Sequence, residues 1–227
     1  MYNSNPILNS PNDITDELIK RIINNDLDSL TINYEFTRWC NEYENADNWK
    51  KEQFQANPFW KANNISPLKR IKFEIKFGRN IHSLASAFEN LEELEQVNIN
   101  GISNVTDIRA MFFGAKSFNQ PIGNWDISKV THMNALFCGA KSFNQPIGNW
   151  NTSNVINMAS VFCGAASFNQ PISNWDTSNV TQMACMFCDA TSFNQPIGNW
   201  NTSRVTDMRD MFNGATSYSY PKPRGAM

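Results

Sequence analysis

A nine-residue segment recurs at a fixed interval through the second half of the chain. It reads Ser-Phe-Asn-Gln-Pro-Ile-Gly-Asn-Trp at residues 117–125 and returns three more times, each copy starting 25 residues after the one before, with Ser173 replacing one glycine. Repetition at such a period is typical of a chain that stacks similar coils, because each coil buries its apolar side chains against the next. Near-identical repeats leave little room for a unique catalytic site.

The apolar residues of the repeat predict a continuous core. Seven apolar positions recur in each full copy, and in the first copy they are Phe118, Ile122, Trp125, Val130, Met133, Phe137 and Ala140. The residues between them are mostly Asn, Gln, Ser, Thr and Gly, which satisfy backbone groups at tight corners. Within each copy we expect a short strand at residues 120–125, a corner at 126–129 and a helical or 3-10 segment at 131–137.

Weaker copies extend the repeat toward the N-terminus. Residues 91–99 read Leu-x-x-Leu-x-x-Val-x-Ile, which is close to the strand of a leucine-rich repeat. Residues 80–88 align with 104–112 and give one further copy of the segment that follows. Residues 71–77 alternate apolar and charged side chains, a pattern that predicts a half-buried strand. We therefore expect the repeat domain to occupy residues 67–227.

Residues 1–66 lack the close repeat and are rich in charged and aromatic side chains. Ile14, Leu18 and Ile22 recur at helical spacing, so we expect two or three short helices in this segment. Such helices would cap the first coil, since the end of a repeat array exposes apolar surface. An alternative is a docking segment, because residues 14–39 are faintly similar to an F-box, a helical motif that binds a ubiquitin-ligase adaptor.

The repeat resembles a known bacterial family. The unit Phe-Asn-Gln-Pro-Ile-Gly-Asn-Trp-Asn-Thr-Ser-Asn-Val-x-x-Met-x-x-x-Phe-x-Gly-Ala is similar to the leucine-rich-repeat variant of BspA-like surface proteins, over about residues 80–220. The resemblance implies an α/β fold, a right-handed parallel-β solenoid of leucine-rich-repeat type, here with a helical N-terminal cap. It implies adhesion or protein binding and supplies no catalytic residues. Members are often secreted or anchored at the surface, whereas this chain shows neither signal.

Charge and hydropathy exclude several classes of function. A net charge of −2 is unlike the basic footprint of a nucleic-acid-binding protein. We expect the short basic stretch at residues 69–79 to be a solvated strand edge. No apolar run approaches the roughly 18 residues that span a bilayer. The first residues lack the basic and apolar regions of a signal peptide, so we expect a cytoplasmic protein, or one exported by a route that does not read such a signal.

The thiols and imidazoles do not form a recognisable active site. Cys138, Cys163 and Cys188 lie one period apart and should stack on successive coils. A metal or redox column is conceivable, but a single file of thiols is not a tetrahedral ligand set, and we interpret them as small buried residues. His82 and His132 lie on different copies without a Ser or Cys partner at a defined spacing. We therefore expect no enzymatic activity, no metal site and no cofactor.

The corner of the repeat carries carboxylates in alternate copies. Asp126 and Asp176 alternate there with Asn151 and Asn201. A calcium site needs about six to eight oxygen ligands, which one or two carboxylates a full period apart do not supply. A stacked Asx-turn, in which each side-chain oxygen accepts a bond from the backbone two residues on, explains the pattern more simply.

The function predicted from the sequence is non-enzymatic binding of a protein partner through the strand face. The alternative is an adaptor, in which the N-terminal helical segment docks one protein while the repeats hold another. We also consider a weak homodimer through the C-terminal rung, with Tyr218 and Tyr220 at the contact; alternatively, these tyrosines complete the core within one chain. The outward candidates for binding are the polar residues of the expected strands: Gln120, Asn124, Gln145, Asn149, Gln170, Asn174, Gln195 and Asn199.

Overall fold

The computed structural model describes a long C-terminal stretch of the chain and several short segments before it. The described residues are 7–8, 29–32, 72–76, 82–90, 92, 94, 97–100 and 102–226. They contain four strands and no helix, so nothing in this part of the chain is a helix that could cross a membrane. The strands are β1 (Ile7–Leu8), β2 (Ser29–Ile32), β3 (Lys72–Lys76) and β4 (Val97–Asn100).

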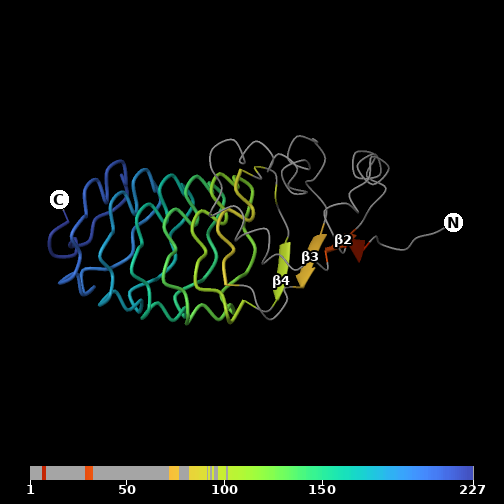
Figure 1. Cartoon of the computed structure of the whole chain (residues 1–227). Helices are drawn as coiled ribbons and strands as arrows, with labels where there is room; N and C mark the ends of the chain where they lie inside the picture. Colours follow the sequence, from red (N-terminus) through yellow and green to blue (C-terminus); the bar gives the residue numbers. More distant parts are fainter. Residues whose placement is uncertain are drawn as a thin grey trace, which may run out of the picture.

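The four strands form one parallel sheet in the order β1-β2-β3-β4. In Figure 1 the labelled strands lie at the end of the molecule opposite the C-terminus. Ile7 pairs with Thr31 and Phe73 pairs with Val97, so each of these two steps spans 24 residues. Two of the three strand pairings are therefore close to the 25-residue period of the repeat, whereas β2 and β3 pair with Ser29 opposite Lys72, 43 residues apart. The sheet joins strands from both sides of residue 66, where the sequence places a domain boundary.

After the sheet, the chain winds into coils that stack along one axis and end at the C-terminus (Figure 1). Each coil is one copy of the repeat. Isolated parallel bridges connect equivalent positions of neighbouring coils, and they run through Ser83, Asp107, His132, Asn157, Gln182 and Asp207. Single bridges of this kind hold the coils in register without forming strands.

Successive β-turns take the place of the expected helical segment at residues 131–137. The Leu136 N–H donates to the Met133 carbonyl at 3.2 Å, which closes a turn within the coil. The neighbouring Ala135 N–H instead donates to the Ala159 carbonyl of the next coil at 2.8 Å. This alternation between bonds within and between coils continues through the segment and excludes the ladder of an α-helix. The prediction of a helical or 3-10 segment is wrong.

Two residues in each turn segment adopt left-handed backbone angles. In one coil they are Ala135, with φ of 56°, and Gly139, with φ of 72°. A positive φ at the third residue of a turn is typical of type II, which matches the bonds that close these turns. The same two positions are left-handed in every described coil, so the backbone itself repeats as closely as the sequence does.

The strand expected at residues 120–125 is also absent. The Trp125 N–H donates to the Ile122 carbonyl at 3.1 Å and closes a turn there. Pro121 has no N–H to offer to a ladder, so the sheet that ends at β4 is not continued in this coil. The predicted fold class, an α/β right-handed parallel-β solenoid with a helical cap, is therefore wrong for the described residues. β2 lies inside the segment that was expected to be helical.

Two of the strands predicted from the sequence are confirmed. The alternating residues 71–77 contain β3, and the leucine-rich-repeat-like residues 91–99 run into β4. Both segments lack proline, so their N–H groups are free to make a ladder. Regular strand pairing is therefore limited to the part of the chain before the close copies.

The predicted apolar columns form the core of the coil stack. Phe118 is fully buried and stacks on Phe143, the equivalent residue of the next coil, with ring centroids 5.9 Å apart. Phe137 packs 3.8 Å from Phe143 and belongs to a second column of phenylalanines. A third column is made of tryptophans, and the indole N–H of Trp150 donates to the Ile122 carbonyl of the coil before it at 3.1 Å. The core prediction is confirmed, although Trp125, Val205 and Met208 are only partly buried.

The phenylalanine column ends in a tyrosine. Tyr218 stacks on Phe193 at 5.8 Å and on Phe212 at 4.3 Å, and its hydroxyl donates to the Pro221 carbonyl at 3.1 Å. Tyr218 therefore completes the core within its own chain, which is the alternative to a dimer contact at this residue. Tyr220, by contrast, is 43% exposed. The homodimer itself stays a prediction.

We expect Tyr218→Ala to lower the free energy of unfolding by about 2 kcal/mol, because it removes two ring contacts and leaves a gap at the end of the column. Tyr220→Ala should change it by no more than about 0.5 kcal/mol, since that side chain is largely solvated. Urea titration followed by tryptophan fluorescence measures both values. Equal midpoints for the two variants would mean that Tyr218 does not belong to the core.

Candidate functional site

The eight residues predicted to bind a partner lie at equivalent positions of four successive coils. The four glutamines are half-buried, whereas the four asparagines are exposed. An exposed proline lies three residues before each asparagine, and these prolines are Pro121, Pro146, Pro171 and Pro196. We call the exposed prolines and asparagines together the Pro–Asn ridge; its asparagines are Asn124, Asn149, Asn174 and Asn199.

A ladder of side-chain hydrogen bonds holds the coils together beside the ridge. Asn169 Oδ1 accepts the backbone N–H of Asn194 at 2.9 Å and the Nε2 of Gln195 at 3.0 Å. The same pattern joins the two preceding coil interfaces, where Asn119 and Asn144 are the acceptors. We call this arrangement the Asn–Gln ladder. It provides the inter-coil bonds that a strand would have made with its backbone.

The Asn–Gln ladder changes the interpretation of the predicted glutamines. Gln145, Gln170 and Gln195 already donate their amide N–H groups to the coil before them, so they hold the stack together and are not free to meet a partner. The asparagine column that begins at Asn119 was not predicted from the sequence. The sequence contains one indication of it, an asparagine two residues before the proline in all four copies. Because proline has no backbone N–H, a side chain beside it has to make the bonds between coils.

The asparagines of the ridge keep their amides available. Asn124, Asn149 and Asn174 make no side-chain hydrogen bond with the described residues, and all three are exposed. Asn199 donates its Nδ2 to the Ser173 carbonyl at 3.2 Å. An amide offers two donors and one acceptor, so each free asparagine can bind the backbone of an extended partner.

Neighbouring coils pack closely beneath the prolines of the ridge. Any side chain at Gly123 would collide with the Pro146 carbonyl of the next coil, and one at Gly148 would collide with the Pro171 carbonyl. Glycine at this position therefore lets neighbouring coils approach closely beneath the prolines. Ser173 is the one departure from glycine among the close copies.

The corner beside the ridge carries the stacked Asx-turns that the sequence predicts. Asp126 Oδ1 accepts the backbone N–H of Ser128 at 3.1 Å, and Asp176 Oδ1 accepts that of Ser178 at 2.9 Å. Bonds from the serine hydroxyl and then from its backbone N–H lower the pKa of each aspartate below its usual value. Both carboxylates are therefore charged at neutral pH, and negative charge flanks the ridge in alternate coils.

The histidines make local contacts within the coil stack. His82 Nδ1 lies 3.2 Å from the Asn104 carbonyl, and His132 Nδ1 lies 2.9 Å from the Thr131 hydroxyl. In the part of the chain that the structure describes, no three His, Cys, Asp or Glu side chains are grouped as metal ligands.

The cysteine column differs from the prediction of full burial. Cys138, Cys163 and Cys188 are half-buried and carry free thiols. A phenylalanine directly precedes each of these cysteines, as Phe137 precedes Cys138. That phenylalanine is fully buried and occupies the inward position of the turn. The thiols consequently lie at the outer side of the turn segment.

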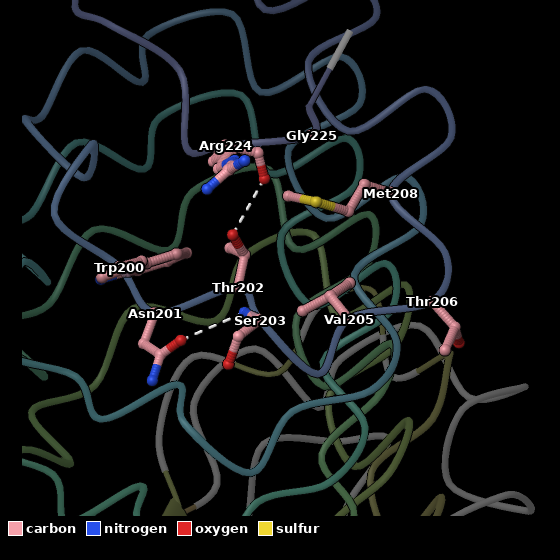
Figure 2. A pocket seen from close by; sticks show the side chains of 9 residues that line it. All are labelled: Trp200, Asn201, Thr202, Ser203, Val205, Thr206, Met208, Arg224 and Gly225. Carbon is pink, nitrogen blue, oxygen red and sulfur yellow. Dashed lines mark hydrogen bonds between the residues drawn. The ribbon is translucent and has the colours of Figure 1, made fainter.

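A pocket lies at the C-terminal end of the stack (Figure 2). Its volume is about 610 Å³, and Trp200 lies on one side of it, with Val205 and Met208 on the other. The Thr202 hydroxyl donates to the Arg224 carbonyl at 2.9 Å, which ties the last described residues to the wall of the pocket. Arg224 is the only side chain in the lining with an ionisable group.

The coil stack corresponds to a known family. Residues 82–167 and residues 146–223 each match the family described as "Mycoplasma protein of unknown function, DUF285", and together the two matches cover more than half of the chain. The chain belongs to the DUF285 family. Each match spans several coils, and the two matches together contain the Pro–Asn ridge, the Asn–Gln ladder and the cysteine column. No curated protein and no solved structure matches the chain. The resemblance to BspA-like repeats is not tested by the DUF285 match and stays a prediction.

Proposed function

We propose that this DUF285 chain is a non-enzymatic module that binds an extended segment of a partner protein along the Pro–Asn ridge. The observation that carries the proposal is the row of exposed, uncharged asparagine amides, which recurs on four successive coils beside exposed prolines. Proline rings offer apolar surface that is already fixed in place, and the amides offer donors and acceptors to a peptide backbone.

Rigidity of the ridge supports this proposal. The Asn–Gln ladder joins successive coils through bonds of 2.9 to 3.1 Å, and Gly123 and Gly148 lie directly against the Pro146 and Pro171 carbonyls of the next coil. A preorganised surface loses little conformational entropy on binding. Each coil contributes only a small contact, so affinity for an extended partner should grow with the number of coils that it covers.

The adaptor alternative has no structural observation of its own. Most of residues 14–39, which are faintly similar to an F-box, lie outside the described residues, and Ser29–Ile32 within them form β2. The adaptor therefore stays a prediction. In that hypothesis the protein docked by the N-terminal segment would be insensitive to changes on the ridge, whereas the repeats would hold a second protein.

The proposal is tested by putting charge on the ridge. The double variant Asn149→Arg, Asn174→Arg adds two bulky cations at exposed positions that make no bond with the described residues. We expect recovery of the specific partner from native cells, measured by quantitative mass spectrometry against the unmodified chain, to fall by about tenfold or more.

The matched control is Asn134→Arg, half a coil away from the ridge. Arg109 and Arg209 occupy the same position of other coils, so the stack accepts arginine there. This control should retain the partner. Retention of every partner by the ridge variant, with its fold intact by circular dichroism, would disprove binding through the Pro–Asn ridge.

A further inference from the structure

Three cysteines occupy one position of the turn segment on three successive coils. Cys138, Cys163 and Cys188 are each half-buried and reduced. The backbone holds neighbouring members in register, because Gly139 donates its N–H to the Cys163 carbonyl and Gly164 donates to the Cys188 carbonyl, both at 2.7 Å. The coils cannot slide past one another without breaking these short bonds, so the thiols stay stacked.

The sulfur atoms of the column interact with one another. The neighbouring Cys163 thiol lowers the pKa of Cys138, whereas that same contact, together with burial, raises the pKa of Cys163. Burial raises the pKa of Cys188 to about 12, and Asp189 beside it acts in the same direction. The carboxylate beside Cys188 therefore disfavours a thiolate at that end of the column.

We propose that Cys138 and Cys163 form a redox-active pair, which a hydroperoxide converts into a disulfide between adjacent coils. The Cys138 thiolate attacks one peroxide oxygen, the O–O bond breaks, and Cys138 sulfenic acid and hydroxide are formed; the hydroxide takes up a proton to give water. The Cys163 sulfur then attacks the sulfenic sulfur and displaces a second water. In total, two thiols and one hydrogen peroxide give one disulfide and two waters, and the sulfur pair supplies both electrons.

The column itself selects this pair. On the other side of Cys138 the equivalent position is Phe113, so Cys163 is the one neighbour in the column that can resolve a sulfenic acid at Cys138. Cys188 starts the reaction less readily, because its thiol lies 3.7 Å from the Asp189 carboxylate, which disfavours a thiolate there. Cys185 stands at another position of the turn, with φ of 55°, and does not belong to the column.

Tryptic mapping separates the possible products. Lys129, Lys141 and Arg204 divide this region so that Cys138 lies in residues 130–141, and Cys163, Cys185 and Cys188 lie together in residues 142–204. The reduced full chain is treated with stoichiometric hydrogen peroxide, alkylated, digested and analysed without reduction. We expect the two peptides to become joined, and the joined product to come from monomeric protein on a non-reducing gel.

Variants show which cysteine of residues 142–204 forms the disulfide with Cys138. Cys163→Ser should abolish the joined peptide and leave Cys138 as a sulfenic acid that dimedone labels. The double variant Cys185→Ser, Cys188→Ser should retain the joined peptide. A freely alkylated Cys138, a disulfide confined to residues 142–204, or a joined peptide found only in covalent dimers would each overturn the proposal.

Discussion

Replacement of Phe162 by alanine is expected to lower the free energy of unfolding by about 3–5 kcal/mol, the usual range for a buried aromatic. The ring is fully buried in the middle of the stack. It packs 3.8 Å from Phe168 and stacks on Phe137 at 5.9 Å and on Phe187 at 5.6 Å. Because the column contacts the coils on both sides, the cavity weakens two coil interfaces at once.

Urea titration of the variant beside a surface control measures this loss. Ile156→Ala is the matched control, since Ile156 is 42% exposed on a nearby part of the same coil, and we expect a change of no more than about 0.5 kcal/mol. Asn157 is a poorer control, although its position varies between copies, because its Oδ1 accepts the Ala159 N–H at 2.9 Å. Indistinguishable midpoints for Phe162→Ala and Ile156→Ala would contradict the assigned core.

The Asn–Gln ladder should be the next most sensitive feature. Asn169→Ala removes the acceptor for the Asn194 N–H and one acceptor for the Gln195 amide, which leaves a half-buried backbone donor unsatisfied. We expect a loss of about 2 kcal/mol in the free energy of unfolding, within the range for an unmade buried hydrogen bond. Thermal and urea unfolding of the same preparation both report it.

A conservative substitution distinguishes the acceptor from simple packing. Asn169→Asp keeps an oxygen at the accepting position, and the Nδ2 group that it replaces makes no bond with the described residues. We therefore expect Asn169→Asp to stay within about 0.5 kcal/mol of the unmodified chain at neutral pH. A loss as large as that of the alanine variant would show that the side-chain oxygen is not what joins the coils.

The core could be predicted from the sequence because burial depends on side chains that repeat visibly. Phe118, Val130 and Phe137 return at every step, and only a stack of coils brings all of their copies together. β3 was also predictable, since strict alternation of apolar and charged residues fits an extended strand. In both cases the pattern of side chains alone determines the local structure.

The path of the backbone between these residues could not be predicted in the same way. Strands and successive turns both bury every second or third residue, so the apolar pattern does not separate them. The φ of 56° at Ala135 could not be predicted, because alanine rarely adopts left-handed backbone angles. Pro121 argued against a strand, but proline is acceptable as the first residue of one. Only the turn that the Trp125 N–H closes excludes the strand at residues 120–125.

The structure separates two kinds of polar residue that the sequence grouped together as candidates for binding a partner. Gln145 and Asn149 look equivalent in the sequence, as exposed polar residues around a proline. The difference between them is geometric, since the carbonyl and the side-chain oxygen of Asn119 lie within reach of Gln145 but not of Asn149. Periodicity indicates which positions are equivalent between coils but does not show which polar groups bond across the interface.

The hydrogen bonds between turn segments all run in the same direction along the stack. Ala135 and Ser160 each donate their N–H forward, to Ala159 and Ala184 of the following coil, so this segment always shows hydrogens on one side and oxygens on the other. A duplicated coil inserted anywhere in the array meets the same complementary edges that its neighbours already offered. Gain or loss of one whole period therefore lengthens or shortens the ridge by one unit.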